Sequence, residues 1–135
     1  MTEDEREAFL SETRLGMLTM LNEQGEPLAV PVWFEWNGSA VRMFSFKRAP
    51  KVRRLRANPR ASLLVVNHIG KPEAWTAFDG DVAISDEGAM ALADRLAPKY
   101  WDMHDASHAK ELADWRKHAS RFCLLTLTPE RIRTS

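Results

Sequence analysis

Cysteine is scarce in this sequence: Cys123 is the only one among 135 residues. A single thiol cannot form a disulfide within the chain, and Cys123 stands in an apolar run, which is typical of a small buried hydrophobe. No neighbour in the sequence would activate this thiol, so nucleophilic catalysis has little support. The cysteine usage is that of a reducing compartment, and we expect a cytoplasmic protein.

Long apolar runs and an excess of charge are also missing. No run approaches the ~20 apolar residues that a membrane-spanning helix needs. The segment Met1–Glu7 is acidic where a signal peptide would be basic. The formal net charge is zero, without the domain-wide positive charge of nucleic-acid-binding proteins. We therefore expect a protein that binds neither membranes nor nucleic acids.

Common phosphate-binding and metal-binding motifs are absent. The sequence contains no GxxxxGK, GxGxxG or HExxH pattern. His104 and His108 are one helical turn apart beside Asp102 and Asp105, but no third ligand accompanies them, so we expect capping and surface roles instead of a metal site. If the chain is an enzyme, a bound organic cofactor is expected to supply the difficult chemical step.

The pattern of apolar runs predicts a mainly β fold with flanking helices. With 44% hydrophobic residues, a chain of this length can form one cored domain, predicted over residues 1–135. Six or so antiparallel strands, mostly joined by hairpins, indicate a closed or split β-barrel. The predicted strands are Leu15–Leu21, Leu28–Trp36, Val41–Phe46, Ala61–Val66, Ala74–Ser85 and Phe122–Thr128.

Proline and glycine mark special positions in these strands. Asn37-Gly38 predicts a hairpin between the second and third strands. Pro31 leaves one backbone position of its strand open, and Gly80 predicts a bulge or a close backbone approach. Pro129 is expected to end the last strand.

Four helices are expected from start and stop signals. A capping box of Thr2 and Glu5 begins the first. The second is basic, the third is expected to stop near Pro98, and the fourth begins at Asp105 or Ser107. The first three are predicted to span about Thr2–Glu12, Ala49–Ala57 and Ser85–Leu96.

A local cluster of positive charge stands out in a neutral chain. Eight lysines and arginines, and no acid, lie between residues 42 and 60. The turn before the basic helix would place Lys47, Arg48 and Lys51 around free backbone N–H groups, which predicts a phosphate cradle. A solvated cationic helix face is the alternative. The eight are Arg42, Lys47, Arg48, Lys51, Arg53, Arg54, Arg56 and Arg60.

Two further segments carry a family resemblance. The sequence Val30-Pro31-Val32-Trp33-Phe34, followed by the pattern K-x-x-x-L-x-x-N-P from Lys51 to Pro59, resembles the pyridoxamine 5′-phosphate oxidase-like family of split-barrel flavoproteins. It is most similar to the small branch whose members bind FMN or the deazaflavin F420. The likeness spans Leu15 to about Val82, and the last third matches mainly through Gly80 and the segment Thr128–Ile132.

The resemblance implies a homodimer with two cofactors in grooves between the subunits. Val30, Pro31, Val32 and Trp33 match the strand along the isoalloxazine edge. Phe44 and Ser45 match the strand end beside the ribityl chain, and Lys51 matches the lysine that holds the phosphate. The chain departs from pyridoxamine 5′-phosphate oxidases in having Ala49-Pro50 for their Ser-Arg pair and Ala29 for an arginine. Lys47 and Arg48 are candidates to replace the missing charge.

The first functional hypothesis is therefore an oxidoreductase, a flavoprotein or deazaflavin protein that passes a hydride between the ring and a small organic substrate. The alternatives are a non-catalytic FMN-, F420- or heme-type binding or sensor protein, and a dimerising barrel without a ligand. Arg53, Arg54 and Arg56 would suit the acidic oligoglutamate tail of F420. FMN is present in every common expression host, and we place it slightly ahead.

Overall fold

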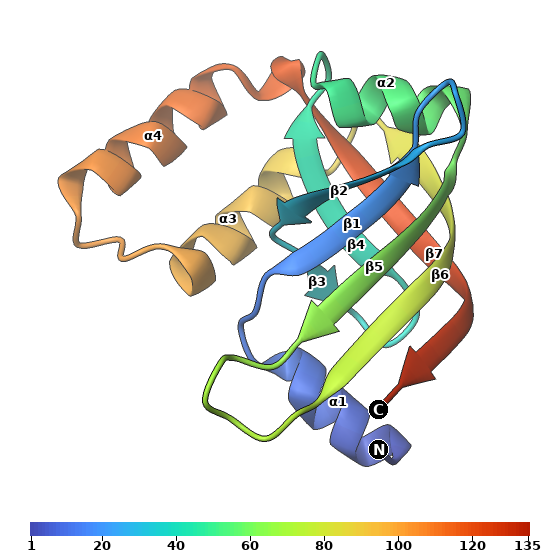
Figure 1. The fold of residues 1–135 in the computed structure, drawn as a ribbon. Coiled ribbons are helices and arrows are strands. Elements are labelled where there is room, and N and C mark those ends of the chain that lie inside the picture. The colour runs from blue at the N-terminus through green and yellow to red at the C-terminus, as the bar shows by residue number, and fades with distance from the viewer.

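An antiparallel sheet of seven strands, in the order β2-β1-β5-β6-β7-β4-β3, carries the fold in the computed structural model, which describes residues 1–135 (Figure 1). The sheet curls into a half-barrel with flanking helices, so the predicted split barrel is confirmed. The strands are β1 (Gly16–Leu21), β2 (Pro27–Val32), β3 (Glu35–Trp36), β4 (Val41–Phe46), β5 (Arg60–Val66), β6 (Trp75–Ser85) and β7 (Phe122–Thr134). The helices are α1 (Glu3–Ser11), α2 (Pro50–Ala57), α3 (Ala89–Tyr100), α4 (Ala106–Lys117) and the short 3₁₀ helix η1 (Ala119–Arg121).

Alternation of apolar side chains places the core inside the curled sheet. In β1, Leu18 and Met20 are buried, whereas Met17 faces outward. The same period of two buries Val41 and Met43 in β4. α2 closes one end of the barrel with its thin apolar face, as its spacing of Val and Leu predicts. The fully buried members of this core include Leu18, Met43, Leu55, Leu63, Phe78, Leu125 and Leu127.

The predicted strand Leu28–Trp36 is in fact two strands. β2 pairs with β1, whereas β3 pairs with β4 at the opposite edge of the sheet. Trp33 and Phe34 cross between these edges. The predicted hairpin around Asn37-Gly38 is therefore present only in the two residue pairs nearest the turn. The alternation in the sequence could not reveal this break, because a strand that changes partners keeps its local extended geometry.

The hydroxyl of Tyr100 stabilises the crossing. It donates to the carbonyl of Arg14 at 2.6 Å and accepts from the N–H of Phe34 at 3.3 Å. These backbone groups have no ladder partner at the crossing, and an unpaired polar group buried there would cost about 1–3 kcal/mol. Burial raises the pKa of this phenol, so it stays protonated and keeps its donor.

Strand β7 continues to Thr134, so the predicted end at Pro129 is wrong. The register between β6 and β7 shifts at Asp79 and Gly80, which leaves Glu130 as an extra residue in β7. Pro129 stands at this bulge, where the ladder requires no N–H from it. The predicted bulge at Gly80 is confirmed. A Cβ on Gly80 would clash with the carbonyl oxygen of Thr128, so the two backbones approach too closely for any side chain.

Helix α3 begins later and ends later than the sequence predicts. Gly88, with φ of 96°, precedes its first turn, and Pro98 lies inside the helix instead of stopping it. Pro98 removes one helical hydrogen bond at an exposed position in the last turn, and the N–H of Trp101 still bonds to the carbonyl of Ala97 at 2.8 Å. α4 begins as predicted, with the carboxylate of Asp105 accepting from the N–H of Ser107.

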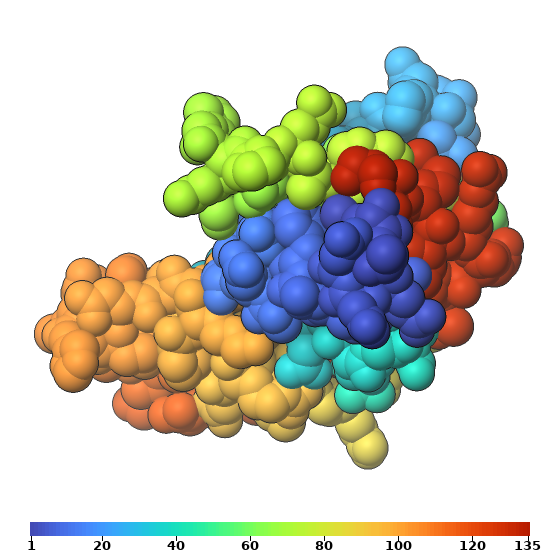
Figure 2. Space-filling view, turned by 90° about the horizontal axis from the view of Figure 1, so that it is seen from below, coloured from blue at the N-terminus to red at the C-terminus, as the bar shows by residue number.

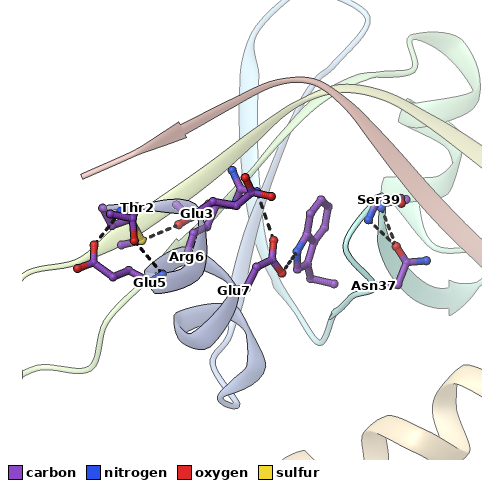
Figure 3. Close-up of polar contacts among 11 residues, drawn as sticks. Thr2, Glu3, Glu5, Arg6, Glu7, Asn37 and Ser39 are labelled. Carbon is purple, nitrogen blue, oxygen red and sulfur yellow. Dashed lines mark hydrogen bonds and ion pairs between the residues drawn. The ribbon is translucent and has the colours of Figure 1, made fainter.

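Helix α1 closes the other end of the barrel. The predicted capping box is present, with the N–H of Glu5 bonded to the Thr2 hydroxyl at 3.2 Å and the N–H of Thr2 to the Glu5 carboxylate at 2.7 Å (Figure 3). Glu7 accepts a hydrogen bond at 2.8 Å from the indole of Trp36, which ties the helix to β3 (Figure 3). Phe9 is buried against the core.

Helices α3 and α4 form an arm that leaves the barrel. α3 covers the outer face of β4 and β7, and α4 lies beyond it (Figure 1). Seen from the α1 end, the arm projects well past the barrel, whereas the two chain ends lie together (Figure 2). Arg116 of α4 is paired with Asp94 of α3 at 2.8 Å. None of the helices combines the length and apolar character needed to cross a membrane.

The bulge gives a prediction for stability. Gly80→Ala forces its Cβ into the Thr128 carbonyl and should lower the free energy of unfolding by about 1–3 kcal/mol, measured by urea denaturation. The control is Gly25→Asn, because Gly25 has open space around it and asparagine tolerates its positive φ of 78°. Equal losses in the two variants would contradict a close backbone approach at Gly80.

Candidate functional site

A groove of about 320 Å³ lies where β2 ends, beside β4, α2 and α4. One cation, Lys51, stands among apolar and aromatic side chains in it, and we call it the Lys51 groove. The crossing of the chain between β2 and β3 brings these elements together, although they are far apart in sequence. The groove is lined by Leu15, Pro31, Val32, Trp33, Phe44, Lys51 and Trp115.

Five of the nine predicted site residues line this groove: Pro31, Val32, Trp33, Phe44 and Lys51. The sequence places them up to twenty positions apart, and their convergence on one cavity comes from the fold.

The other four predicted residues lie elsewhere. Val30 packs against the barrel core, and Ser45 is only 5% exposed, with its hydroxyl bonded to the carbonyl of Phe46 at 3.1 Å. Lys47 and Arg48 line a neighbouring cavity of about 630 Å³. The three predicted phosphate-binding cations therefore lie at two cavities, with Lys51 at one and Lys47 and Arg48 at the other.

Aromatic contacts fix the orientation of Trp33. Its ring is stacked on Tyr100, with centroids 4.9 Å apart and an angle of 7° between the planes. Trp101 meets it edge-on at 4.8 Å, and Phe44 lies 6.0 Å away at 73°. Such pairs contribute about 0.5–1.5 kcal/mol each beyond their buried area, so this wall of the groove is preorganised.

Trp115 is a lining residue that the site prediction missed. It comes from α4, and its ring lies 5.6 Å from Phe44, 5.0 Å from Trp101 and 5.7 Å from Phe122. α4 buries only Leu112 fully, so these ring contacts hold much of the arm against the barrel. Five tryptophans in a chain of this size were the available signal, but the sequence does not say which of them meet.

Lys51 is a partly buried cation without an acidic partner. No ion pair involves it, and burial lowers the pKa of its ammonium group. An unpaired, partly desolvated ammonium gains most from an anion whose oxygens accept its hydrogen bonds, such as a phosphate. The groove therefore has one end suited to an anion and walls suited to a flat apolar group.

The remaining cations of the cluster divide into paired and unpaired groups. Lys47 lies 3.5 Å from Asp86, and Arg60 forms ion pairs with Asp81 at 3.0 Å and Glu130 at 2.8 Å. The unpaired arginines Arg53 and Arg54 line a separate cavity of about 380 Å³ beside the turn between β1 and β2.

The lining of the Lys51 groove contains no carboxylate, imidazole or thiol. Cys123 is fully buried as expected, and burial raises its pKa, so it remains a thiol and is no nucleophile. The arrangement can bind a flat ring, hold an anionic group at one end, and exclude water. Apart from Lys51 the lining offers no titratable side chain, so redox chemistry in this groove would require a bound molecule.

Solved structures with the same fold have several ligand classes in their names. An F420 reductase aligns with a TM-score of 0.75 at 20% identity over 94% of both chains. An FAD-binding protein from Mesorhizobium loti aligns with a TM-score of 0.65 at 22% identity over 99% of this chain and 92% of the other. A heme storage protein from Vibrio cholerae aligns with a TM-score of 0.67 at 18% identity over 97% and 92%.

These identities establish a shared fold and leave the ligand of this chain open. A comparison with curated proteins gives no match. The family model described as pyridoxamine 5′-phosphate oxidase matches residues 2–135, nearly the whole chain. The chain belongs to the pyridoxamine 5′-phosphate oxidase family.

Proposed function

We propose that the protein is an oxidoreductase that binds FMN or F420 in the Lys51 groove and transfers a hydride between the ring and a small organic substrate. The observation that carries this proposal is Lys51, a partly desolvated cation without an acidic partner, at an apolar groove walled by Trp33 and Trp115. Both cofactors combine a flat tricyclic ring with a phosphate, which matches this division of the groove.

Each lining residue has a physical role in this proposal. Lys51 holds the phosphate through a charge-assisted hydrogen bond, and Phe44 contacts the chain that joins phosphate and ring. Pro31 and Val32, on the edge strand β2, lie along the ring edge, and alternate backbone groups of an edge strand are free to bond to it. When bound, the ring supplies the hydride chemistry, and Trp33 and Trp115 shield it from water.

Lys47 and Arg48 reinforce the positive potential around the phosphate without lining the same cavity. Both lie in the turn that leads into α2, as does Lys51 at the start of that helix. The two cavities are therefore neighbours.

A second copy of the chain is proposed to complete the groove. Met17 of β1 stands between Pro31 of β2 and Leu64 of β5 in the sheet register. Met17 and Leu64 are each 37% exposed, and Leu15, which lines the groove, is 52% exposed. This apolar strip continues from the groove across the outer face of the sheet, as expected of an interface between two subunits.

A polar network borders the apolar strip. Arg133 donates to both carboxylate oxygens of Asp79, at 2.7 and 2.8 Å, and Ser62 donates to the same carboxylate. The hydrogen bond from Arg133 lowers the pKa of Asp79 to about 2, so the carboxylate stays charged at neutral pH. An apolar centre with a charged, hydrogen-bonded border is the usual composition of a protein interface.

The choice between the cofactors depends on surface outside the groove. F420 carries an acidic oligoglutamate tail beyond its phosphate, and FMN does not. Arg53 and Arg54 offer unpaired positive charge on α2, at the cavity beside the β1–β2 turn, but Glu23 also lines that cavity. We therefore retain FMN as the first candidate and F420 as the second.

Cofactor binding gives a prediction for Lys51. Lys51→Ala removes a charge-assisted bond worth roughly 1.5–3 kcal/mol, so FMN or F420 should bind about ten- to a hundredfold more weakly. The measurement is a titration of cofactor-free protein with each compound, followed by ring fluorescence. The matched control is Arg53→Ala, an exposed cation of the same helix, which should have little effect. Equal losses in both variants would indicate diffuse electrostatic attraction.

The same titration orders the cofactors. Binding of F420 to the unaltered protein at least tenfold tighter than FMN, about 1.4 kcal/mol, would reverse the order proposed here. Failure to bind either compound would overturn the proposed function.

Hydride transfer requires a separate test. We expect the reduced, protein-bound cofactor to be reoxidised anaerobically by at least one compound in a panel of quinones, enones and nitroaromatics, followed by ring absorbance. Trp115→Leu keeps the groove wall apolar but removes the large ring, so it should slow turnover more than it weakens cofactor binding. Tight binding without reoxidation by any acceptor would favour a non-catalytic binding protein instead.

The proposed dimer gives a further prediction. Met17→Glu places a charge in the apolar strip and should raise the dimer dissociation constant by at least about tenfold, measured by sedimentation velocity across a concentration series. The control is Ala113→Glu, at an exposed position of α4 away from the strip. A monomer at micromolar concentration of the unaltered protein would refute the dimer.

A further inference from the structure

A second cavity, distinct from the Lys51 groove, lies between the end of β4 and η1. It has a volume of about 630 Å³, within the range of small-molecule sites, and shares no lining residue with the groove. Its five lining residues are Phe46, Lys47, Arg48, Ser120 and Arg121. The two segments meet beside the start of α2 (Figure 1).

Backbone hydrogen bonds fix the rim of this cavity. The N–H of Lys47 donates to the carbonyl of Arg121 at 2.8 Å, which joins the two segments directly. The N–H of Ala49 donates to the carbonyl of Phe46 at 3.1 Å, and that of Arg121 to the carbonyl of His118 at 2.9 Å. The side chains on this rim therefore project from a defined backbone.

Phe46 supplies an exposed aromatic face. The side chain is 51% exposed, although burying a phenylalanine fully would contribute about 1.5–3 kcal/mol. Its ring packs on Phe122, with centroids 4.5 Å apart and 31° between the planes, and Phe122 is only 2% exposed. One face of the Phe46 ring is thus supported from below, and the exposed remainder is a platform for a flat group.

Positive charge surrounds this platform. Arg48 and Arg121 form no ion pair, and Lys47 meets only Asp86, an exposed carboxylate 3.5 Å away. The hydroxyl of Ser120 makes no hydrogen bond within the protein, so it is available to a ligand. An excess of cationic donors beside an aromatic ring suits a ligand that is both flat and anionic.

We propose that this cavity binds an aromatic phosphate of the size of a nucleoside monophosphate, as a second site beside the Lys51 groove. The flat ring stacks on Phe46, and the phosphate lies among Arg48, Arg121 and the Ser120 hydroxyl. Lys47 adds charge from the side that faces Asp86. None of these residues lines the Lys51 groove, so a ligand here would occupy a separate cavity, although Lys47 and Arg48 also add positive potential at the neighbouring groove.

The test is calorimetric titration of the protein with AMP, compared with adenosine and with inorganic phosphate. We expect AMP to bind at least about tenfold more tightly than either part, because the site recognises ring and anion together. Arg121→Gln should weaken AMP binding about tenfold, and Phe46→Leu should weaken it about fivefold or more, since base stacking on an aromatic contributes about 1–3 kcal/mol.

Two control variants distinguish binding in this cavity from diffuse attraction and from binding in the Lys51 groove. Arg53→Gln removes the same charge from an exposed position of α2 and should leave AMP binding unchanged; a loss equal to that of Arg121→Gln would overturn the proposal in favour of diffuse attraction. Lys51→Gln should also leave AMP binding unchanged, and a large loss would place AMP in the groove instead.

Absence of AMP binding to the unaltered protein, or equal binding of adenosine, would refute the site. The outcome for FMN and F420 is measured separately and does not decide this test.

Discussion

The crossing of the chain at Trp33 and Phe34 brings together the two edges of the sheet and the elements that form the groove. It joins the two edges of the sheet through only two residues, so the sheet must curl until the end of β2 lies near β4. Tyr100 stabilises the crossing twice, through hydrogen bonds to backbone groups and through the stacked contact with Trp33. Because Tyr100 ends α3, the same side chain anchors the helical arm to the barrel. The wall of the Lys51 groove that Trp33 forms is therefore held in place by Tyr100.

The cations of this chain differ in whether they have an acidic partner. The chain is neutral as a whole, yet the segment before and within α2 carries cations alone. Arg60 at the end of this segment has acidic partners across the sheet, whereas Lys51 has none and is partly desolvated. A cation of this kind is costly unless an anion accompanies it, so it marks a binding position more specifically than the exposed arginines around it do.

The arm of α3 and α4 completes the aromatic lining of the Lys51 groove. The barrel contributes Pro31 and Phe44 to the groove, but α4 adds Trp115 from a segment more than sixty residues further along the chain. Solved proteins of this fold have F420, FAD or heme in their names, so the fold alone does not determine the ligand. The ligand of this chain then depends on the side chains around its groove, such as Trp115 and Lys51.

Several local features of this protein can be predicted from its sequence alone. The capping box at Thr2, the strand β4 and the basic helix α2 each depend on residues close together in the chain, where backbone preferences act directly. The close approach at Gly80 was also predicted, although its partner Thr128 lies far along the chain. The family resemblance also selected Pro31, Trp33 and Lys51, which lie in one groove. The folded structure was needed to show that the stretch Leu28–Trp36 divides between two sheet edges and that β7 continues past Pro129. Both depend on which distant strand supplies the hydrogen-bond partners, and that choice is made by the packing of the whole barrel.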